Sequence, residues 1–191
     1  MSFFRRPTLT VARDLLGRYL VRTLGRKVLV GRIVEVEAYR GSDDAASHAY
    51  RGRTARNDVM FWEGGHLYVY FTYGMHFCAN VVTGQAGKPG AVLLRAVEPV
   101  AGIQSLRHNR GGIVNDQCLT NGPAKLCEAF GIARRENGAS LQGPALMLTA
   151  GTPPPHGRRA RSSRIGIRNG REKRWRFFER GNPWLSAGPR P

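Results

Sequence analysis

The chain lacks any long apolar run and is poor in cysteine. No segment approaches the ~20 consecutive apolar residues that a membrane-spanning helix needs, so we expect no membrane association. The opening residues MSFFRRPTL contain no apolar stretch typical of a secretory signal, and we expect none. Three cysteines, an odd number without a CxxC spacing, argue against a disulfide framework and indicate thiols in a reducing compartment.

Motifs of enzymes that use metals or nucleotides are also absent. The sequence contains no HExxH, no paired Cys/His spacing for zinc and no carboxylate cluster for two metals. It has neither a Walker A loop nor a GxGxxG turn in a βαβ pattern, and it lacks the zinc deaminase signature. The sequence therefore predicts no metal site and no nucleotide cofactor.

Acidic residues are scarce relative to basic ones. Thirteen Asp and Glu stand against 30 Lys and Arg, which gives a net charge of +17 and a pI near 11.2. Such a charge attracts polyanions and predicts salt-sensitive nucleic-acid binding. Most of the basic residues are arginine, which recognises phosphate bidentately. GC-rich coding also raises arginine content, so charge alone leaves the partner open.

The hydrophobic pattern predicts one α+β domain over residues 1–191, built on a mainly antiparallel sheet with flanking helices. Residues 1–7 and 186–191 are expected to fray, and residues 151–160 to form a surface loop. Predicted strands span residues 19–24, 27–39, 67–73, 76–82, 91–97, 146–149, 163–167 and 175–178. Predicted helices begin at residues 7–10, 98–99 and 121–123.

One predicted strand carries two carboxylates. Alternation along residues 27–39 places Leu29, Ile33, Glu35, Glu37 and Tyr39 on one face. A carboxylate among apolar residues is either a solvent-facing group of an edge strand or part of a site. A single glutamate in a strand is more often a surface group, and Glu35 competes directly with Glu37 for any catalytic role.

Residues 67–73 and 76–82 predict an aromatic hairpin with the turn Tyr73-Gly74-Met75. This turn is apolar, whereas solvent-facing turns are normally polar. In a strongly basic chain, an apolar turn suggests a wedge between stacked bases. A carboxylate beside aromatic side chains suggests chemistry on a base taken out of the duplex. Core packing is the alternative for the aromatic residues, and contact with another loop is the alternative for Tyr73.

Several cations are expected to contact phosphates. Arg51, Arg53 and Arg56 lie in the polar loop 40–56, and Lys125 lies near the start of the helix predicted after residue 121. Residues 158–180 form the densest basic region. A charge run is usually a solvated face, and DNA-backbone contact is the other interpretation.

Residues Gly31–His48 read GRIVEVEAYRGSDDAASH, and residues Leu67–Val82 read LYVYFTYGMHFCANVV. These segments resemble the alkyladenine (3-methyladenine) DNA glycosylase family. The resemblance covers nearly the whole chain, through residues 54–61, 92–99, 121–127, 164–167 and 175–186. It implies a curved antiparallel sheet similar to a formyltransferase C-terminal domain, with a protruding hairpin that inserts into DNA.

The resemblance assigns roles to individual residues. Glu37, in Glu-Ala-Tyr followed by His48, matches the base that activates water and stabilises an oxocarbenium-like sugar. Arg95 matches an arginine that helps to hold the water and the phosphate of the target nucleotide. Further matches are the walls of the base pocket (Tyr39, His48 and Tyr70), the residue that rejects guanine (Asn80) and the intercalating turn (Tyr73, with Met75).

The implied function is a monofunctional, metal-free purine DNA glycosylase that starts base excision repair. It would remove alkylated adenines such as 3-methyladenine from damaged double-stranded DNA, with hypoxanthine implied by the family's range. It would act as a monomer without a cofactor, in the bacterial cytoplasm at the nucleoid or in a eukaryotic nucleus. Ala55 stands where many members have proline, and His76 where tyrosine is familiar; both departures bear on lesion preference. A non-catalytic nucleic-acid-binding module is the alternative.

Overall fold

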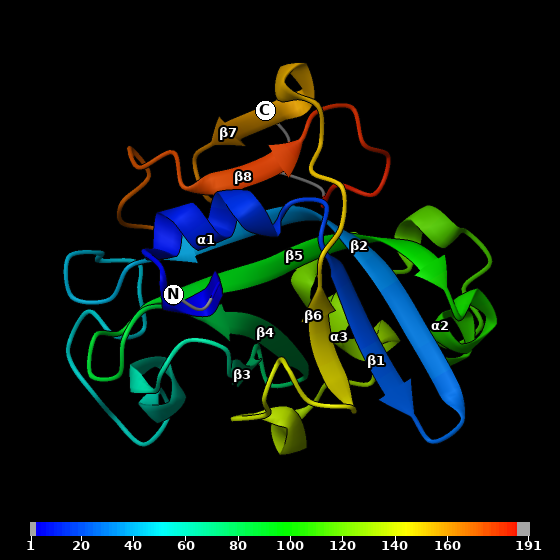
Figure 1. Cartoon of the computed structure of the whole chain (residues 1–191), viewed down its shortest axis with the longest axis horizontal. Helices are drawn as coiled ribbons and strands as arrows, with labels where there is room; N and C mark the ends of the chain where they lie inside the picture. Colours follow the sequence, from blue (N-terminus) through cyan, green and yellow to red (C-terminus); the bar gives the residue numbers. More distant parts are fainter. Residues whose placement is uncertain (1–2, 187–191) are drawn as a thin grey trace.

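The computed structural model describes residues 3–186, through which one curled antiparallel sheet runs (Figure 1). The predicted α+β class and the mainly antiparallel sheet are confirmed. The strands are β1 (Tyr19–Leu24), β2 (Lys27–Tyr39), β3 (Leu67–Thr72), β4 (His76–Val82), β5 (Ala91–Ala101), β6 (Leu146–Thr149), β7 (Arg159–Ser162) and β8 (Arg176–Glu179). The helices are α1 (Thr8–Leu15), α2 (Ile103–Asn109) and α3 (Pro123–Ala129), with 3-10 turns at Phe3–Arg5, Asp58–Phe61, Asp116–Cys118, Arg134–Glu136 and His156–Arg158. Within the described residues, no helix is long and apolar enough to cross a bilayer.

Strand β2 forms the centre of the sheet, whose order is β3-β4-β5-β2-β1-β6. β5 pairs with one edge of β2 from Val30 to Tyr39. On the other edge, the first half of β2 pairs with β1, and residues 35–37 pair with β8, which also pairs with β7. β8 comes from near the end of the described chain. Its pairing therefore brings a late segment beside the two carboxylates of β2 (Figure 1).

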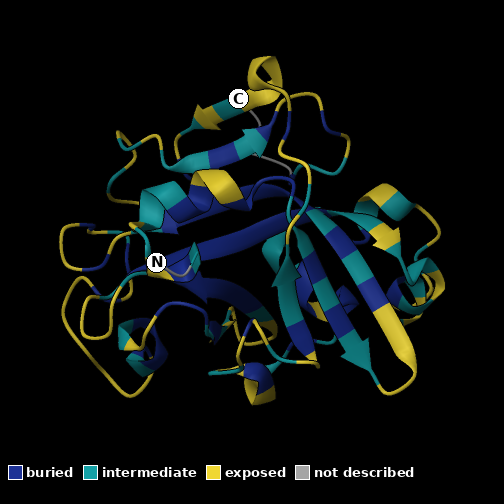
Figure 2. Ribbon diagram, in the orientation of Figure 1, coloured by how far each residue is buried: buried dark blue, intermediate teal, exposed yellow. Residues whose placement is uncertain are grey.

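The main apolar core joins the sheet to the helices. Val11 and Leu15 of α1 and Leu126 of α3 are fully buried in one cluster with residues of β2, β4 and β5. These three strands are buried along most of their length, whereas the β1–β2 turn is exposed (Figure 2). Burial of apolar surface contributes roughly 25 cal/mol per Å². The candidate site is thus built on the most strongly packed strands of the sheet.

A paired irregularity in β2 and β5 changes which residues share a face. The register shifts on both sides of Glu35, and it skips Val34 on β2 and Arg95 on β5. Ile33 and Val36, three positions apart, therefore both enter the main core. The expected unbroken alternation, with both carboxylates of β2 on the face of Ile33, is wrong. Extra residues of this kind re-aim side chains next to sites, and here they turn both carboxylates away from the main core.

Two predicted boundaries are also wrong. Glu98 and Pro99, expected to open a helix, continue β5 because both pair with β2. Helix α2 begins at Ile103 instead. The strand expected at residues 163–167 lies at Arg159–Ser162, where β7 pairs with β8. In both cases, pairing with a distant strand overrides the local signal.

The chain ends pack more closely than expected. Phe4, within the tail that was expected to fray at residues 1–7, lies in a 3-10 turn and is buried in the main core. Ser186 is buried, while residues 1–2 and 187–191 of the two expected tails lie outside the described residues. The expected surface loop 151–160 contains a 3-10 turn and runs into β7 at Arg159.

Candidate active site

A cavity of about 400 Å³ lies between β2, β5, the β3–β4 hairpin and two loops. One loop, residues 40–56, follows β2, and the other, residues 163–175, joins β7 to β8. The volume falls within the ~300–1,000 Å³ of typical small-ligand pockets. Residues from the sequence prediction that line the cavity are Tyr39, His48, Tyr70, Tyr73, Asn80 and Arg95.

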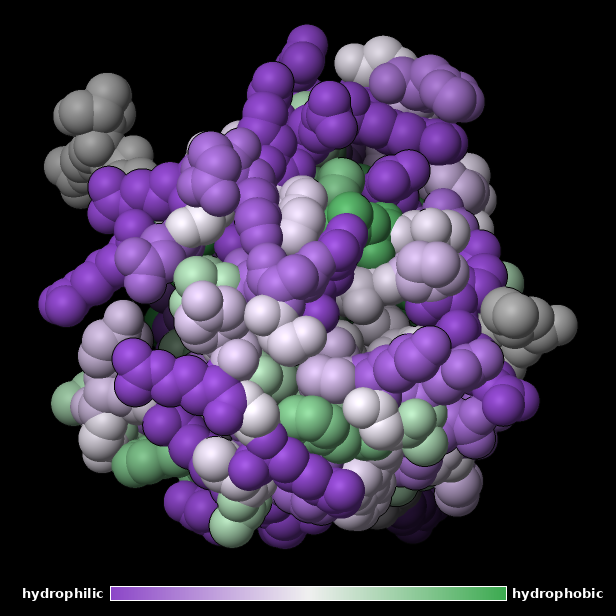
Figure 3. Space-filling model, turned by 90° about the vertical axis from the view of Figure 1, so that its left-hand side faces the viewer, coloured by the Kyte–Doolittle hydropathy of each residue, from purple (hydrophilic) through white to green (hydrophobic). Residues whose placement is uncertain are grey.

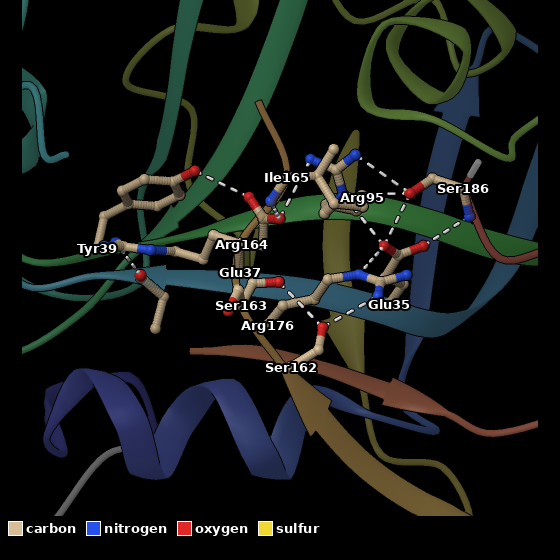
Figure 4. A network of polar contacts seen from close by, with 11 residues as sticks. Glu35, Glu37, Tyr39, Arg95, Ser162, Ser163, Arg164, Ile165, Arg176 and Ser186 are labelled. Atoms are coloured by element: carbon tan, nitrogen blue, oxygen red, sulfur yellow. Dashed lines mark hydrogen bonds and ion pairs between the residues drawn. The ribbon is translucent and has the colours of Figure 1, made fainter. Parts of the chain in front are cut away.

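Glu37 lies directly behind the cavity wall. Its Oε2 accepts a hydrogen bond from the Tyr39 hydroxyl at 2.8 Å. Its Oε1 accepts one from the backbone N–H of Ile165 at 2.7 Å and pairs with Arg95 Nη1 at 3.4 Å (Figure 4). The carboxylate has no exposed surface of its own, but all three partners line the cavity. Each residue that binds the Glu37 carboxylate therefore lines the cavity, although Glu37 itself does not.

Glu35 is held by a different set of partners. Its Oε1 pairs with Arg95 Nε at 3.1 Å and with Arg176 Nε at 2.6 Å. The same oxygen accepts a hydrogen bond from the Ser186 hydroxyl at 2.7 Å. Its Oε2 accepts a hydrogen bond from the Ser186 backbone N–H at 2.6 Å. Of these partners, Arg95 alone lines the cavity. The geometry thus separates the two acids, since Glu37 is held by three residues that line the cavity, whereas Glu35 is enclosed on the side of β8 and Ser186 (Figure 4).

Arg95 links the two carboxylates from the irregular position on β5. Burial by itself lowers the pKa of Arg95, but the charges of Glu37 and Glu35 outweigh it and raise that pKa above its ordinary value. Tyr39 is held as a hydrogen-bond donor, because burial and then the charge of Glu37 raise its pKa well above 10.0. The cavity floor therefore combines a permanent cation, a neutral hydroxyl and a carboxylate behind them.

Aromatic rings form one wall of the cavity. The His48 and Tyr70 rings meet edge to face with centroids 4.5 Å apart, and His48 Nδ1 lies 3.0 Å from the Tyr68 hydroxyl. Burial, followed by the charge of Arg56, lowers the pKa of His48 from its ordinary value and so favours the neutral imidazole. Burial raises the pKa of Tyr68 to about 12. The surroundings of this wall thus favour the neutral forms of His48 and Tyr68.

Tyr68 is a site residue that the sequence analysis missed. Tyr68 and Tyr70 are two positions apart on β3, so their side chains lie on the same face of the strand. That two-residue spacing was the signal that could have identified it. Asn80 lies opposite Tyr68 in the β3–β4 register and donates its amide to the Tyr68 carbonyl at 3.1 Å.

The hairpin turn is exposed, as its proposed role requires. Tyr73 is 84% exposed and Met75 is 70% exposed. The Tyr73 backbone has φ 51°, and Gly74 follows with φ 69°. Tyr73 also lines the cavity, so the apolar turn and the cavity are adjacent parts of one surface.

Comparison with known proteins identifies the family. A match to the family described as Methylpurine-DNA glycosylase (MPG) covers residues 2–183. The chain belongs to the methylpurine-DNA glycosylase family. Membership makes it a DNA glycosylase, a hydrolase that cleaves N-glycosidic bonds in DNA repair, and the predicted family and enzyme class are confirmed.

Three curated relatives carry the name "Putative 3-methyladenine DNA glycosylase". The one from Carboxydothermus hydrogenoformans is 47% identical over 97% of this chain and 96% of the relative. The one from Streptomyces avermitilis is 47% identical over 97% of this chain and 89% of the relative. The one from Chlorobaculum tepidum is 44% identical over 100% of this chain and 92% of the relative.

The cations expected to bind phosphate lie outside the cavity of this glycosylase. Arg51 is exposed. Arg53 pairs with Asp58 at 2.6 Å. Arg56 donates to the Phe71 carbonyl at 3.2 Å, at the hairpin. Lys125 donates to Asn121 Oδ1 at 2.7 Å. Arg53 and Lys125 therefore already have protein partners that phosphate would have to share or displace.

A second basic region of the glycosylase surrounds β7 and β8. Long hydrophilic side chains cover the upper part of the face in Figure 3, where β7, β8 and the loop between them lie in Figure 1. The exposed arginines of this region are Arg158, Arg159, Arg161, Arg168, Arg171, Arg174 and Arg180. Arg168 also lines the cavity, and the sequence analysis did not single it out. Among the described residues, no group of three or more His, Cys, Asp or Glu is arranged to hold a metal ion.

Proposed function

We propose that this glycosylase removes alkylated adenines such as 3-methyladenine from duplex DNA, after rotating the damaged nucleotide out of the helix. The observation that carries the proposal is a cavity with an aromatic wall, backed by the Tyr39–Glu37–Arg95 group. Hypoxanthine, which is uncharged, is a second proposed substrate. We also propose that the enzyme acts as a monomer without a cofactor.

Recognition of the base would rest on stacking and charge. An alkylated adenine in DNA is cationic, and a cation over an aromatic face gains ~0.5–2 kcal/mol. Stacking adds ~1–3 kcal/mol per base. A neutral His48 preserves this preference, because a protonated ring would repel a cationic base. Flipping costs least free energy for poorly paired bases. Damaged nucleotides are therefore flipped preferentially, before the cavity contacts the base.

Glu37 would act on the water that attacks C1′. Each carboxylate oxygen has two lone-pair sites, and Oε2 accepts one hydrogen bond among the described residues, from Tyr39. The free site could accept a proton from a water entering through the cavity. As the bond from water oxygen to C1′ forms, the C1′–N9 bond breaks and its electron pair neutralises the cationic purine. The water proton passes to Glu37, and the carboxylate stabilises the positive charge on the sugar.

The hairpin would supply the wedge. Tyr73 and Met75 present apolar surface at the turn, and insertion between base steps is the established use of such side chains in the minor groove. The adjacent cavity would then receive the displaced nucleotide. The arginines around β7–β8 and in the loop 40–56 would contact the phosphates that flank it.

The test is release of 3-methyladenine from a duplex under single-turnover conditions. We expect the unchanged enzyme to free the base, and Glu37→Gln to keep DNA binding while it loses at least ~10²-fold in rate, the low end for loss of a general base. Glu35→Gln is a poor control, because it would disturb four buried contacts. Glu98→Gln on β5 is suitable, since that side chain is partly exposed and pairs with Arg32.

Two outcomes would contradict the proposal. An unchanged enzyme that binds duplex but frees no base would be a nucleic-acid-binding module rather than a catalyst. If Glu37→Gln releases the base at the same rate as Glu98→Gln, Glu37 is not the catalytic base.

A further inference from the structure

Asp44 and Arg164 form a fully buried ion pair that the proposed reaction does not use. Both side chains have zero exposure. Arg164 Nη1 lies 2.5 Å from Asp44 Oδ2, and Nη2 lies 2.7 Å from Oδ1, a parallel two-bond contact. Arg164 Nη1 also donates to the Ala38 carbonyl at 2.9 Å. Burial favours the neutral form of Asp44, but the hydrogen bonds and charge of Arg164 outweigh it, and the pKa of Asp44 lies below 3.8.

The pair joins the two loops that wall the cavity. Asp44 belongs to the loop 40–56, in which Ala45, Ala46 and His48 line the cavity, and Arg164 begins the segment whose residues 165–169 line the opposite side. The two residues are 120 positions apart in the sequence. A bidentate contact between planar groups constrains direction as well as distance, so it sets how these loops face each other.

Arg164 lies next to two of the three groups that hold Glu37, the Tyr39 ring and the backbone of Ile165. Its guanidinium lies over the Tyr39 ring, 4.7 Å from the centroid, and the Tyr39 hydroxyl donates to Glu37 Oε2. Ile165, the next residue, donates its N–H to Glu37 Oε1. Figure 4 shows Arg164 extending toward Tyr39, with Ile165 directed at Glu37.

Stability alone is a weak explanation for this pair. Burying two charges costs desolvation energy, and replacing such a pair by apolar residues is often neutral or stabilising. Arg164 Nε is also buried without a hydrogen-bond partner among the described residues, an arrangement that adds cost. What the pair provides is direction for the Tyr39 ring and the Ile165 N–H.

We propose that Asp44 and Arg164 are positioning residues that orient Tyr39 and Ile165 toward Glu37, and so govern the rate of base release rather than the affinity for DNA. This inference rests on the proposed function of Glu37. Small displacements of a reacting group lower rates strongly, and about 1 Å can cost ~10²-fold.

The experiment compares Asp44→Asn with a matched control, Glu136→Gln. Glu136 is also a buried carboxylate in an ion pair, with Arg22 at 2.6 Å, and it does not line the cavity. Both substitutions neutralise a buried acid without changing its shape. We expect similar losses of melting temperature, and at least a ~10-fold slower single-turnover release of 3-methyladenine for Asp44→Asn alone, with the Kd for duplex within ~3-fold of the unchanged enzyme.

A double-mutant cycle separates positioning from general loosening. If the pair acts through Tyr39, then Asp44→Asn combined with Tyr39→Phe should lose less rate than the product of the two single losses. Arg164→Lys keeps the charge but not the planar fork, and it serves as the second variant if Asp44→Asn does not fold. We expect it to show the same slow release with unchanged duplex affinity.

The proposal is overturned if Asp44→Asn releases base as fast as Glu136→Gln, if the cycle with Tyr39→Phe is multiplicative, or if both Asp44→Asn and Arg164→Lys fail to fold. These results leave the proposed function intact when Glu37→Gln remains inactive. If Glu37→Gln is active instead, the proposed function fails first.

Discussion

Tyr73 holds a backbone conformation that its side chain disfavours, and replacing it with asparagine shows what the tyrosine ring contributes. Tyr73 and Gly74 both have positive φ, and the Met75 N–H donates to the Thr72 carbonyl at 3.3 Å. These are the signs of a type I′ turn, in which Asn-Gly is the favoured pair. Within residues 3–186, Tyr73 is the one residue other than glycine with positive φ.

The free protein should be at least as stable with Tyr73→Asn. The left-handed region costs an ordinary side chain about 1–2 kcal/mol, and asparagine tolerates it better. Because the ring is 84% exposed, its loss removes little burial, and exposed substitutions usually change stability by within ~0.5 kcal/mol. We therefore expect the free energy of unfolding to stay level or to rise by up to about 1 kcal/mol.

Flipping of the damaged base should weaken in the same variant. Stacking of an aromatic ring on a base is worth ~1–3 kcal/mol, and each 1.36 kcal/mol is a factor of ten. Loss of the Tyr73 ring should thus lower the equilibrium constant for flipping by ~5- to ~150-fold. Strain at the turn would then be explained by the ring's contact with DNA.

The assay follows a fluorescent base analogue beside the lesion while enzyme is titrated, with chemical denaturation of the same preparations. Val114→Asn is the matched control, because it removes an apolar side chain that is 83% exposed on the loop after α2. The control should leave flipping unchanged. A Tyr73→Asn enzyme that flips normally, or one that loses more than ~1 kcal/mol of stability, would make Tyr73 a packing residue.

Three further predictions concern selectivity, charge and pH. Asn80→Ser should raise the ratio of guanine to 3-methyladenine excision, measured as single-turnover rates on matched duplexes, because trimming the side chain relieves a clash with the 2-amino group. The Kd for undamaged duplex should rise at least ~10-fold between 50 and 200 mM salt, measured by anisotropy, as bound arginines release counterions. Binding of a cationic lesion should weaken as acid protonates His48, at a pH below that at which an ordinary histidine titrates, because burial lowers the pKa of His48.

Each of these has its own control. An unchanged ratio for Asn80→Ser would leave that residue as the hydrogen-bond partner of Tyr68. A flat salt titration would contradict phosphate contact by the arginines. At acidic pH the unchanged enzyme should lose more affinity for a cationic lesion than for hypoxanthine, and His48→Gln should abolish this difference. If the unchanged enzyme and His48→Gln lose equal affinity, another group is the one that titrates.

Sequence patterns alone determined much of the fold. Strands β1, β2, β4 and β6 have the predicted bounds, because alternation of apolar residues and glycine-containing turns act over only a few neighbours. The exposed hairpin turn also follows from its local sequence. The family follows from motifs that are contiguous in the chain, and four residues expected in the base pocket do line one cavity.

The local sequence favoured Glu37 over Glu35, through the match of Glu-Ala-Tyr followed by His48, but the surroundings of each acid came only from the tertiary structure. The two acids are two positions apart, so strand alternation by itself treats them alike. Ser186 and Arg176 enclose Glu35 from 151 and 141 positions away, whereas Ile165 reaches Glu37 from 128 positions away. Val34 and Arg95, which the β2–β5 register leaves without a partner, change the alternation so that both carboxylates point away from the main core. Burial and long-range hydrogen bonds depend on where distant segments pack, and no short-range period in a sequence carries that information.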